Sequence, residues 1–425
     1  MKVIKMKIKA LKGVHDILPD QINTWNYVLN QAAEKFQVYG YRQIIIPIIE
    51  ESCLFIRGIG QETDIIEKEM YAFEDRGKRK IALRPEATAS VVRAYLEHNL
   101  AQQGLVKLFY SGAMFRGEKP QAGRNRQFYQ IGVESLGSSS PYLDAETITL
   151  AVDYLTQLGL KEFKLLINTV GSVQDKEIFS KKLKNYFKEK TEQLCANCQK
   201  RYHRSVLRIL DCKNKSCRNL IEKAPMITDS LSEKSKTEFQ LVKKLLLNSG
   251  INFIESNHLV RGLDYYTKTV FEIIHDGLGA QNTILAGGRY DDLVAELGGT
   301  PTGAIGFAAG MERLILAMSA ENIKISAVKK KSVYIIGLGH IAHDKAWEIA
   351  HNLRQLNIVT HINLSEKSLK SLMREANKIN CDYVLILGDD ELKTNSIIIK
   401  DMDKGIQSLI ALDDFGNKII NLIND

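Results

Sequence analysis

A charged segment, "MFRGEKPQAGRNRQFYQIGVE" at residues 114–134, carries the side chains best suited to chemistry. Side chains alternate between the two faces of a strand, so parity decides which of them lie together in a hairpin. A core could take Phe109, Ala113, Phe115, Tyr129, Ile131 and Val133 from one face. The other face would carry Tyr110, Gly112, Met114, Arg116, Glu118, Arg126, Phe128, Gln130, Gly132 and Glu134.

The polar face of this hairpin is open to two interpretations. A solvated surface would account for the charge alone. However, Gly132 leaves room between the polar heads of Gln130 and Glu134, which favours a site. An arginine clamp beside an aromatic ring suits a nucleotide, because guanidinium binds phosphate bidentately and the ring stacks on a base. The sequence therefore predicts a nucleotide site on this face.

Length and composition describe an ordinary globular protein. The 425 residues are enough for two or three domains, and 44% of them are hydrophobic. No apolar run approaches the roughly 20 residues of a membrane span, and the N-terminus lacks the apolar region of a secretory signal. We therefore expect a cytoplasmic protein with no membrane segment, and six cysteines fit a reducing compartment. The net charge of +8 permits a polyanionic partner. Translation could start at Met1 or Met6.

The first part of the chain mixes helix and strand signals. We expect Asp20 to cap the first helix, Pro47 to lie at a sheet edge or an interface, and Pro85 to occupy the first turn of a helix. Helices are expected at residues 20–40 and 144–158, strands at 41–50 and 163–171, and a hairpin at 106–136.

The second part changes character twice. A basic stretch at roughly residues 172–256 predicts an insertion or a small helical subdomain. Between residues 174 and 223, fourteen Lys or Arg stand against six Asp or Glu, which could meet a phosphate backbone or form a solvated face. A Gly-rich strand then runs into a helix at residues 302–318, before a linker near 328–332. Beyond it, alternating strands and helices predict a separate α/β domain.

These segments together resemble class II aminoacyl-tRNA synthetases, and among them bacterial histidyl-tRNA synthetases. "KGVHDILP" resembles their N-terminal signature, "RQIIIPIIEES" motif 1, the charged hairpin motif 2 and "GAIGFAAGMERL" motif 3. Those motifs occur across class II enzymes. "LVRGLDYYTKTVFE" and "AGGRYDDLV" resemble stretches peculiar to the histidine enzymes, so they are the specific signal. The resemblance covers nearly the whole chain.

The resemblance implies an architecture and an activity. It implies an α+β catalytic domain at residues 1–325, with a mainly antiparallel sheet flanked by helices and the insertion at about 172–256. An α/β anticodon-binding domain would follow at residues 330–425. The implied activity joins L-histidine to ATP, with Mg²⁺ at the phosphates and release of pyrophosphate, and then passes the histidyl group to its tRNA. A homodimer with Pro47 at its interface is implied as well.

The resemblance also implies roles for single residues. Arg116 and Arg261 would flank the α-phosphate as catalytic arginines, and Gln121 would lie near the acceptor end of the tRNA. The implied ATP site consists of Arg116, Glu118, Arg124, Phe128 and Arg313. The implied histidine site consists of Glu86, Ala87, Thr88, Arg116, Gln130, Glu134, Arg261, Tyr265, Tyr266 and Tyr290.

Histidine specificity would depend on Glu134 and Tyr266. A neutral imidazole has one donor and one acceptor nitrogen, so a carboxylate and a phenol on opposite sides can engage both. The chain departs from the family pattern at Ala87 and Asp292, where many members have Gly. Neither change removes a polar group, so we expect tuned binding and not a lost activity.

Four cysteines in the insertion have metal-ligand spacing. They form CxxC, thirteen residues and then CxxxxC, close to a zinc ribbon, with His203 as an alternative ligand. The resemblance does not require a metal here, so we expect four reduced thiols and no metal site, although zinc stays open. The cysteines concerned are Cys195, Cys198, Cys212 and Cys217.

Three alternative functions each fail to account for some of these sequence features. A regulatory paralogue that senses histidine for ATP phosphoribosyltransferase typically lacks the C-terminal domain and parts of the two motif sets, and both are present here. A class II enzyme for another amino acid does not account for "LVRGLDYY". A plain RNA-binding module does not account for the paired arginines and tyrosines of the expected pocket.

Overall fold

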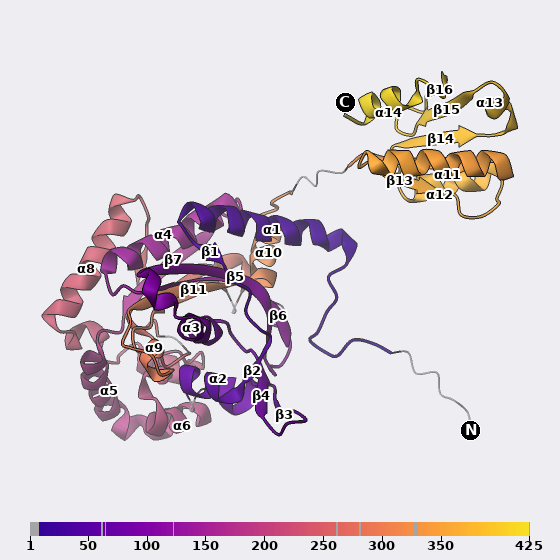
Figure 1. The fold of residues 1–425 in the computed structure, drawn as a ribbon. Helices are drawn as coiled ribbons and strands as arrows, with labels where there is room; N and C mark the ends of the chain where they lie inside the picture. Colours follow the sequence, from indigo (N-terminus) through magenta and orange to yellow (C-terminus); the bar gives the residue numbers. More distant parts are fainter. Residues whose placement is uncertain are drawn as a thin grey trace, which may run out of the picture. The chain divides into compact units, whose positions relative to one another are not determined.

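The fold is known from a computed structural model that describes residues 8–60, 63, 65–121, 123–260, 262–279, 282–325 and 330–424. The chain divides after residue 325 into two compact units (Figure 1). Each unit has its own sheet and core. In the described part of the chain, no helix is both long and apolar enough to cross a membrane.

One eight-stranded sheet organises the first unit, in the order β1-β5-β6-β11-β10-β9-β7-β8. The two edge pairs, β1–β5 and β7–β8, are parallel and all inner pairs are antiparallel. The mainly antiparallel sheet expected from the sequence is therefore confirmed. Its strands are β1 (Arg42–Gln43), β5 (Val106–Phe115), β6 (Gln127–Leu136), β7 (Phe163–Thr169), β8 (Ile254–Glu255), β9 (Thr267–His275), β10 (Thr283–Arg289) and β11 (Ala304–Gly310).

Helices flank the sheet on both faces (Figure 1). The main core lies under one face and includes Phe109, Ile131 and Val133, as the parity of the hairpin predicts. That face packs against α1 (Pro19–Val38), α4 (Pro141–Gln157), α8 (Glu233–Asn248) and α10 (Met311–Ala320). The other face packs against α3 (Thr88–Glu97) and α9 (Leu293–Glu296), beside α2 (Ser52–Ile59). A small antiparallel sheet consists of β2 (Ile49–Glu51), β4 (Lys80–Leu83) and β3 (Ala72–Glu74).

Several local predictions were wrong at element ends. Leu18 precedes the first helix, and Asp20 lies in its first turn instead of capping it. The strand expected at 41–50 breaks into β1 and β2 around Pro47, because proline has no N–H for a ladder. Pro85 lies before α3, whose cap position is Ala87. The room expected beside Gly132 is filled, because a Cβ there would lie 2.3 Å from the Tyr110 hydroxyl.

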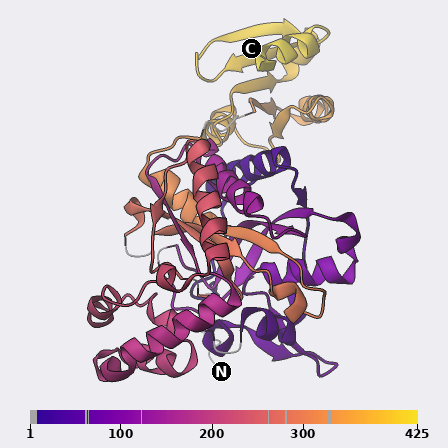
Figure 2. The same cartoon turned by 90° about the vertical axis from the view of Figure 1, so that its left-hand side faces the viewer.

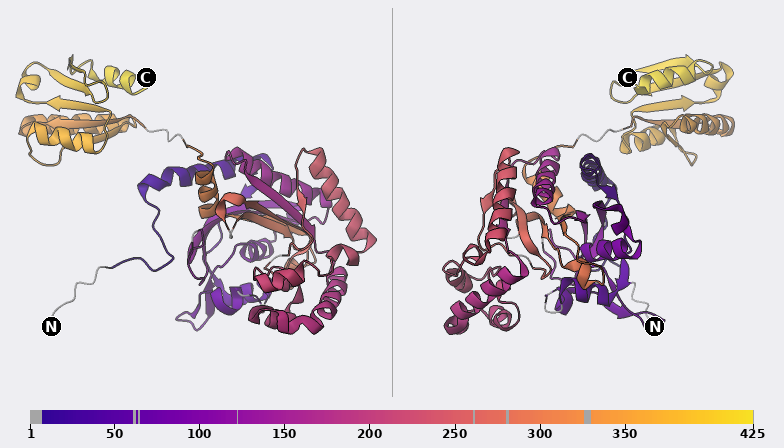
Figure 3. Two further views of the ribbon diagram at one scale, coloured as in Figure 1. Left: turned by 180° about the vertical axis from the view of Figure 1, so that it is seen from behind. Right: turned by 60° about the vertical axis from the view of Figure 1, so that its left-hand side comes forward.

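The insertion has a small core of its own. Residues from Phe179 to Leu231 form one apolar cluster, whereas α8 packs its buried side chains into the main core. Figures 2 and 3 show its helices gathered at the end of α8. They are α5 (Val173–Phe187), α6 (Ala196–Arg204) and α7 (Lys215–Ile221). Short helical turns throughout the unit are Ile65–Glu69, Leu100–Gln103, Lys188–Gln193, Val206–Ile209, Ile227–Ser230 and Asp276–Leu278.

The second unit is a separate α/β fold with a mixed sheet in the order β13-β12-β14-β15-β16. The sequence predicted its alternating strands and helices, but not the short helix α13 or the edge strand β16. Its elements are β12 (Ser332–Gly337), α11 (His340–Gln355), β13 (Val359–Ile362), α12 (Leu369–Lys378), β14 (Tyr383–Leu387), α13 (Asp389–Lys393), β15 (Ser396–Asp401), β16 (Gln407–Ala411) and α14 (Phe415–Asn424).

Candidate active site

A cavity of about 1010 Å³ opens on the α3 side of the main sheet. Residues of four neighbouring strands form its floor. The strands β6, β11, β10 and β9 contribute them. Twelve of the residues selected from the sequence line this one cavity: Glu86, Thr88, Arg116, Glu118, Arg124, Phe128, Gln130, Glu134, Tyr265, Tyr266, Tyr290 and Arg313.

Three selected residues are placed differently. Ala87 is fully buried next to the cavity, between two residues that line it. Gln121 is exposed in the hairpin loop, where its backbone exchanges two hydrogen bonds with that of Arg124, at 3.0 and 2.8 Å. Arg261, the expected catalytic arginine, lies outside the described residues.

Glu134 lines the cavity and is only 1% exposed. One carboxylate oxygen accepts a hydrogen bond from the Thr88 hydroxyl at 2.7 Å, and the other accepts one from the Tyr290 hydroxyl. Burial raises the pKa of Glu134 to about 8, against the lowering effect of these two hydrogen bonds. The Glu134 carboxyl group can therefore gain or lose its proton near neutral pH.

Glycine at position 306 makes this placement possible. Gly306 of β11 pairs directly with Glu134 of β6. A Cβ at Gly306 would lie 1.9 Å from a carboxylate oxygen of Glu134, closer than any contact allows. The absence of a side chain therefore leaves the volume in which the carboxylate lies.

A second buried carboxylate, Glu86, organises the start of α3. It accepts hydrogen bonds from the backbone N–H groups of Thr88 at 2.6 Å and Ala89 at 3.0 Å. These are N–H groups that the first turn of a helix leaves without partners. Burial raises the pKa of Glu86, while these N–H groups and the charge of Arg116 oppose the shift.

Three tyrosines form the wall beside Glu134. The rings of Tyr265 and Tyr266 lie 4.7 Å apart, and the ring of Tyr290 meets Tyr265 edge-on at 5.6 Å. On β6, the strand that also carries Glu134, the side-chain oxygen of Gln130 is buried and has no hydrogen-bond partner among the described residues. An unpartnered buried acceptor points to a ligand that donates a hydrogen bond there.

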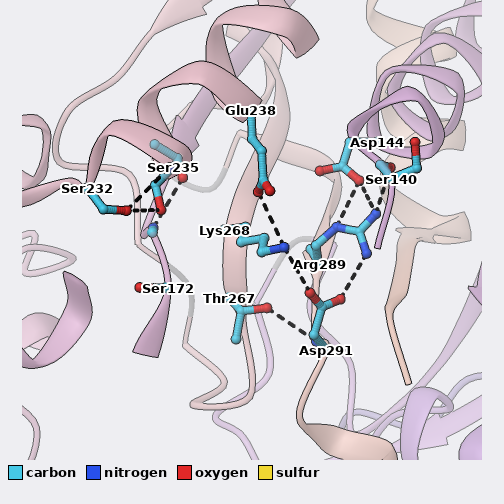
Figure 4. A network of polar contacts seen from close by, with 12 residues as sticks. Ser140, Asp144, Ser172, Ser232, Ser235, Glu238, Thr267, Lys268, Arg289 and Asp291 are labelled. Carbon is cyan, nitrogen blue, oxygen red and sulfur yellow. Dashed lines mark hydrogen bonds and ion pairs between the residues drawn. The ribbon is translucent and has the colours of Figure 1, made fainter. Parts of the chain in front are cut away.

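A buried ion-pair network fixes the backbone next to Tyr290 (Figure 4). Arg289 is fully buried between Asp144 of α4 and Asp291, with 2.9 Å between its Nε atom and Asp144 and 2.8 Å between Nη1 and Asp291. Lys268 joins Asp291 to Glu238 of α8, at 3.4 and 3.3 Å. The network therefore attaches the "GRYDD" segment to α4 and α8.

The hairpin end of the cavity is positively charged. The Arg116 guanidinium lies 5.1 Å from the centre of the Phe128 ring, and its Nε donates to the Pro85 carbonyl at 2.9 Å. A cation thus lies beside the ring of a residue that lines the cavity. Arg124 pairs with Glu118 at 3.1 Å, and Arg313 donates to the backbone of the hairpin loop and β10.

Burial and neighbouring cations act on Arg313. Burial lowers the pKa of Arg313, and the charges of Arg124 and Arg116 lower it further, while Glu118 and Glu272 raise it. Arginine remains charged at any physiological pH despite such shifts. This end of the cavity therefore carries three guanidinium groups and two carboxylates close together.

Sequence reasoning missed some residues of the cavity. Glu272 of β9 and Glu312 at the start of α10 line it, and burial raises the pKa of Glu312 to about 7. Both lie in the quoted motifs, so their carboxylates were a signal that could have been used. Lys213, Lys215 and Arg218 of the insertion also line the cavity. Only the fold brings these three there.

The two departures from the family pattern, Ala87 and Asp292, cause no backbone strain. Ala87 has φ −109° and Asp292 has φ −92°, both in regions that any residue adopts. Glycine would not be required at either position for its freedom to adopt positive φ.

The sheet, its hairpin and the Gly-rich strand–helix junction are those of a class II aminoacyl-tRNA synthetase. Residues 13–314 match the family described as Histidyl-tRNA synthetase, and residues 332–422 match the family described as Anticodon binding domain. The chain belongs to the histidyl-tRNA synthetase family.

Individual relatives agree over nearly their full lengths. The histidine–tRNA ligase of Halothermothrix orenii is 45% identical over 96% of this chain and 97% of its own length. That of Thermosipho melanesiensis is 43% identical over 95% of this chain and 96% of its own. The solved structure of apo S. aureus histidyl-tRNA synthetase has 34% identity and a TM-score of 0.82, and covers 99% of this chain and 100% of that one.

Proposed function

We propose that the chain is a histidine–tRNA ligase: it activates L-histidine with ATP, releases pyrophosphate and passes the histidyl group to the 3′ end of its tRNA. The observation that carries this proposal is the convergence of Glu134, Tyr266 and Arg116 on one cavity from segments far apart in the sequence. An imidazole site beside a cationic phosphate site is what the first step needs. The α/β unit at 330–424 would bind the anticodon part of the tRNA.

The histidine end of the cavity would select the imidazole ring. Glu134 would accept a hydrogen bond from one ring nitrogen and the Tyr266 hydroxyl would engage the other. Glu86, Thr88 and Gln130 would surround the α-amino group, and the unpartnered oxygen of Gln130 supports this placement. An amino acid without these ring nitrogens would offer Glu134 and Tyr266 no hydrogen bond, and a site built to bind a substrate N–H can discriminate by about 10⁴–10⁵ in this way. No separate editing step is then needed.

The phosphate end would stabilise the reaction electrostatically. In the first step a histidine carboxylate oxygen bonds to the α-phosphorus while the bond to the leaving pyrophosphate breaks. Negative charge meets an anionic centre, so fixed cations lower the barrier without proton transfer. Arg116 and Arg261 would flank the α-phosphate, Arg124 and Arg313 would contact the outer phosphates, and the Phe128 ring would stack on the adenine.

Mg²⁺ fits this end of the cavity. Hard cations prefer carboxylate oxygens together with substrate phosphates, and Glu118 and Glu272 both interact with the charge of Arg313 in the cavity. When bound, Mg²⁺ would neutralise phosphate charge. Glu118 and Glu272 are the residues that we expect to hold it.

A second copy of the chain would cover the motif 1 surface. Three aliphatic side chains around Pro47 are strongly exposed: Ile45 at 87%, Ile48 at 45% and Ile49 at 51%. Large exposed apolar side chains that cluster in a short segment are typical of an interface. We therefore expect a homodimer, and Ile45→Asp should shift the sedimentation velocity towards the monomer. A cytoplasmic location stays a prediction.

Two assays on purified protein test the function. Histidine-dependent ATP–pyrophosphate exchange reports the first step, and charging of a histidine tRNA transcript reports the second. We expect exchange with histidine and none with other amino acids at equal concentration. A protein that binds histidine without exchange would instead be the regulatory paralogue, and the proposal would be abandoned.

A further inference from the structure

The insertion brings four thiols together at one point. Cys195 and Cys198 stand at the start of α6, and Cys212 and Cys217 flank the turn into α7. The four sulfur atoms all lie within 4.8 Å of one another. His203, the alternative ligand considered from the sequence, is exposed and does not belong to this group. We propose that these four cysteines bind one structural Zn²⁺, in place of the metal-free insertion expected from the sequence.

The sulfur spacing is that of a tetrahedral site. Zinc–thiolate bonds of about 2.3 Å place the sulfur atoms of a tetrahedron about 3.8 Å apart. The sulfur atoms of Cys195 and Cys212 are 3.8 Å apart. The backbone N–H of Cys195 points to the sulfur of Cys217 at 3.3 Å, so a backbone donor already faces one of the ligand atoms. Ligand atoms thus stand close to their final positions before a metal arrives.

Disulfides and simple packing explain this arrangement less well. A disulfide requires about 2.05 Å between two sulfur atoms and pairs each cysteine with one other, whereas here four converge together. Cys198 and Cys217 belong to the small apolar core, but Cys195 and Cys212 are only half-buried at its edge. Packing alone does not account for four sulfur atoms that converge on one point.

The surroundings suit the charge of the site. Binding replaces four thiol protons with one divalent cation, which leaves two net negative charges. Residues 195–218 carry seven Lys or Arg and one Asp, which would offset that charge. Four soft sulfur ligands select zinc or an iron–sulfur cluster among common metals, and a closed four-ligand site is structural.

The metal would hold a basic loop at the active-site cavity. Lys213 and Lys215 lie between the last two ligands and Arg218 follows them, and all three line the cavity. The insertion core is small, and domains of this size commonly need a metal or disulfide for stability. Arg204 of α6 also forms an ion pair with Glu67, which lies outside the insertion in the Ile65–Glu69 turn. Joining α6 to α7 would therefore fix the loop relative to the cavity.

Metal analysis of the full-length protein tests the site directly, without relying on the proposed function. Protein purified without chelators should contain one zinc per chain by plasma mass spectrometry. After exchange, Co²⁺ should give the intense visible absorption of tetrahedral tetrathiolate coordination. Cys212→Ser should lose the zinc, while Cys53→Ser and Cys381→Ser, outside the cluster, should retain it.

Three results would overturn the site. These are less than one zinc in ten chains with no Co²⁺ spectrum, iron with acid-labile sulfide in place of zinc, or only two titratable thiols in denatured, chelator-treated protein instead of six. The last result would mean two disulfides. Because all three are read on the unaltered chain, a variant that fails to fold does not affect them.

The role of the loop rests on the proposed function and needs a second readout. In Cys212→Ser, the KM for histidine tRNA should rise by about tenfold, equivalent to about 1.4 kcal/mol, with a smaller change in kcat. An unchanged KM would mean that the metal, even if bound, does not position the loop. Absence of pyrophosphate exchange in the unaltered protein would instead refute the proposed function and leave the zinc site standing.

Discussion

The protonation of Glu134 should control histidine affinity. Glu134 is fully buried and its pKa is raised to about 8, chiefly because burial penalises the charged form. At pH 7 the free protein therefore holds this carboxyl about nine-tenths protonated. Binding an imidazole N–H requires the carboxylate, so histidine must displace the proton. The cost at pH 7 is about 1.4 kcal/mol relative to pH well above 8, or about tenfold in affinity.

The sign of this effect follows from the direction of the shift. Because the folded pKa lies above the ordinary value of 4.5, the group stays protonated in the native state as pH rises from about 4.5 towards 8. Histidine affinity should increase over the upper part of that window and level off above it. Stability of the unliganded protein should decrease over the same window, since unfolding releases the carboxyl to ionise in water.

Calorimetry can measure the proton directly. Histidine is titrated into the protein at pH 7 in buffers of different ionisation enthalpy, which gives the number of protons released per histidine bound. The unaltered protein should release about 0.9 proton more per site than Glu134→Gln. Glu97→Gln, an exposed carboxyl change on α3, should behave like the unaltered protein. The comparison also cancels the titration of histidine itself. Parallel affinity profiles for the unaltered protein and Glu134→Gln from pH 6.5 to 8.5 would refute the reasoning.

Three further substitutions have expected outcomes. Arg116→Met should lower the rate of pyrophosphate exchange by about 10²–10³, as loss of one preorganised charge donor does. Arg289→Met should lower the free energy of unfolding by about 3–5 kcal/mol in urea titrations, because it leaves Asp144 charged and buried without its partner. Gly306→Ala should raise the KM for histidine at least tenfold, about 1.4 kcal/mol, because its methyl group would occupy the carboxylate position. Gly310→Ala on the same strand, with 3.7 Å of space, should change it little.

Matched controls separate these effects from general damage. Arg76→Met removes an exposed charge and should leave exchange unchanged. Arg79→Met breaks an exposed pair with Asp75 and should cost less than about 1 kcal/mol. Equal losses in Arg79→Met and Arg289→Met would show that burial of the latter pair is not the cause. An Arg116→Met variant with normal exchange would remove that residue from the catalytic role.

Which hairpin residues face the core and which line the cavity could be predicted where the pattern is local in sequence. The alternation along the 106–136 hairpin separated most of these residues: Phe109, Ile131 and Val133 are buried in the main core, and Arg116, Gln130 and Glu134 line the cavity. Met114 of the expected polar face is instead buried in a second core. Strand parity is a property of consecutive residues and survives folding unchanged. The predicted ends of elements were less accurate: the strand expected at 41–50 breaks at Pro47, which has no N–H for a ladder, and Pro85 lies outside α3. Tertiary contacts also decide where an element ends, and the sequence does not show them.

By itself, the sequence determined the family and the mainly antiparallel sheet, and it selected twelve residues that line one cavity, because residue identity and period are properties of the chain itself. Only the tertiary structure decided what depends on distance between remote segments. It placed Gly306 against Glu134 and the loop at Lys213–Arg218 at the cavity. It also brought four sulfur atoms within 4.8 Å, whereas their spacing in sequence had left a metal site undecided. Spacing constrains which ligands can meet, but only packing fixes whether they do.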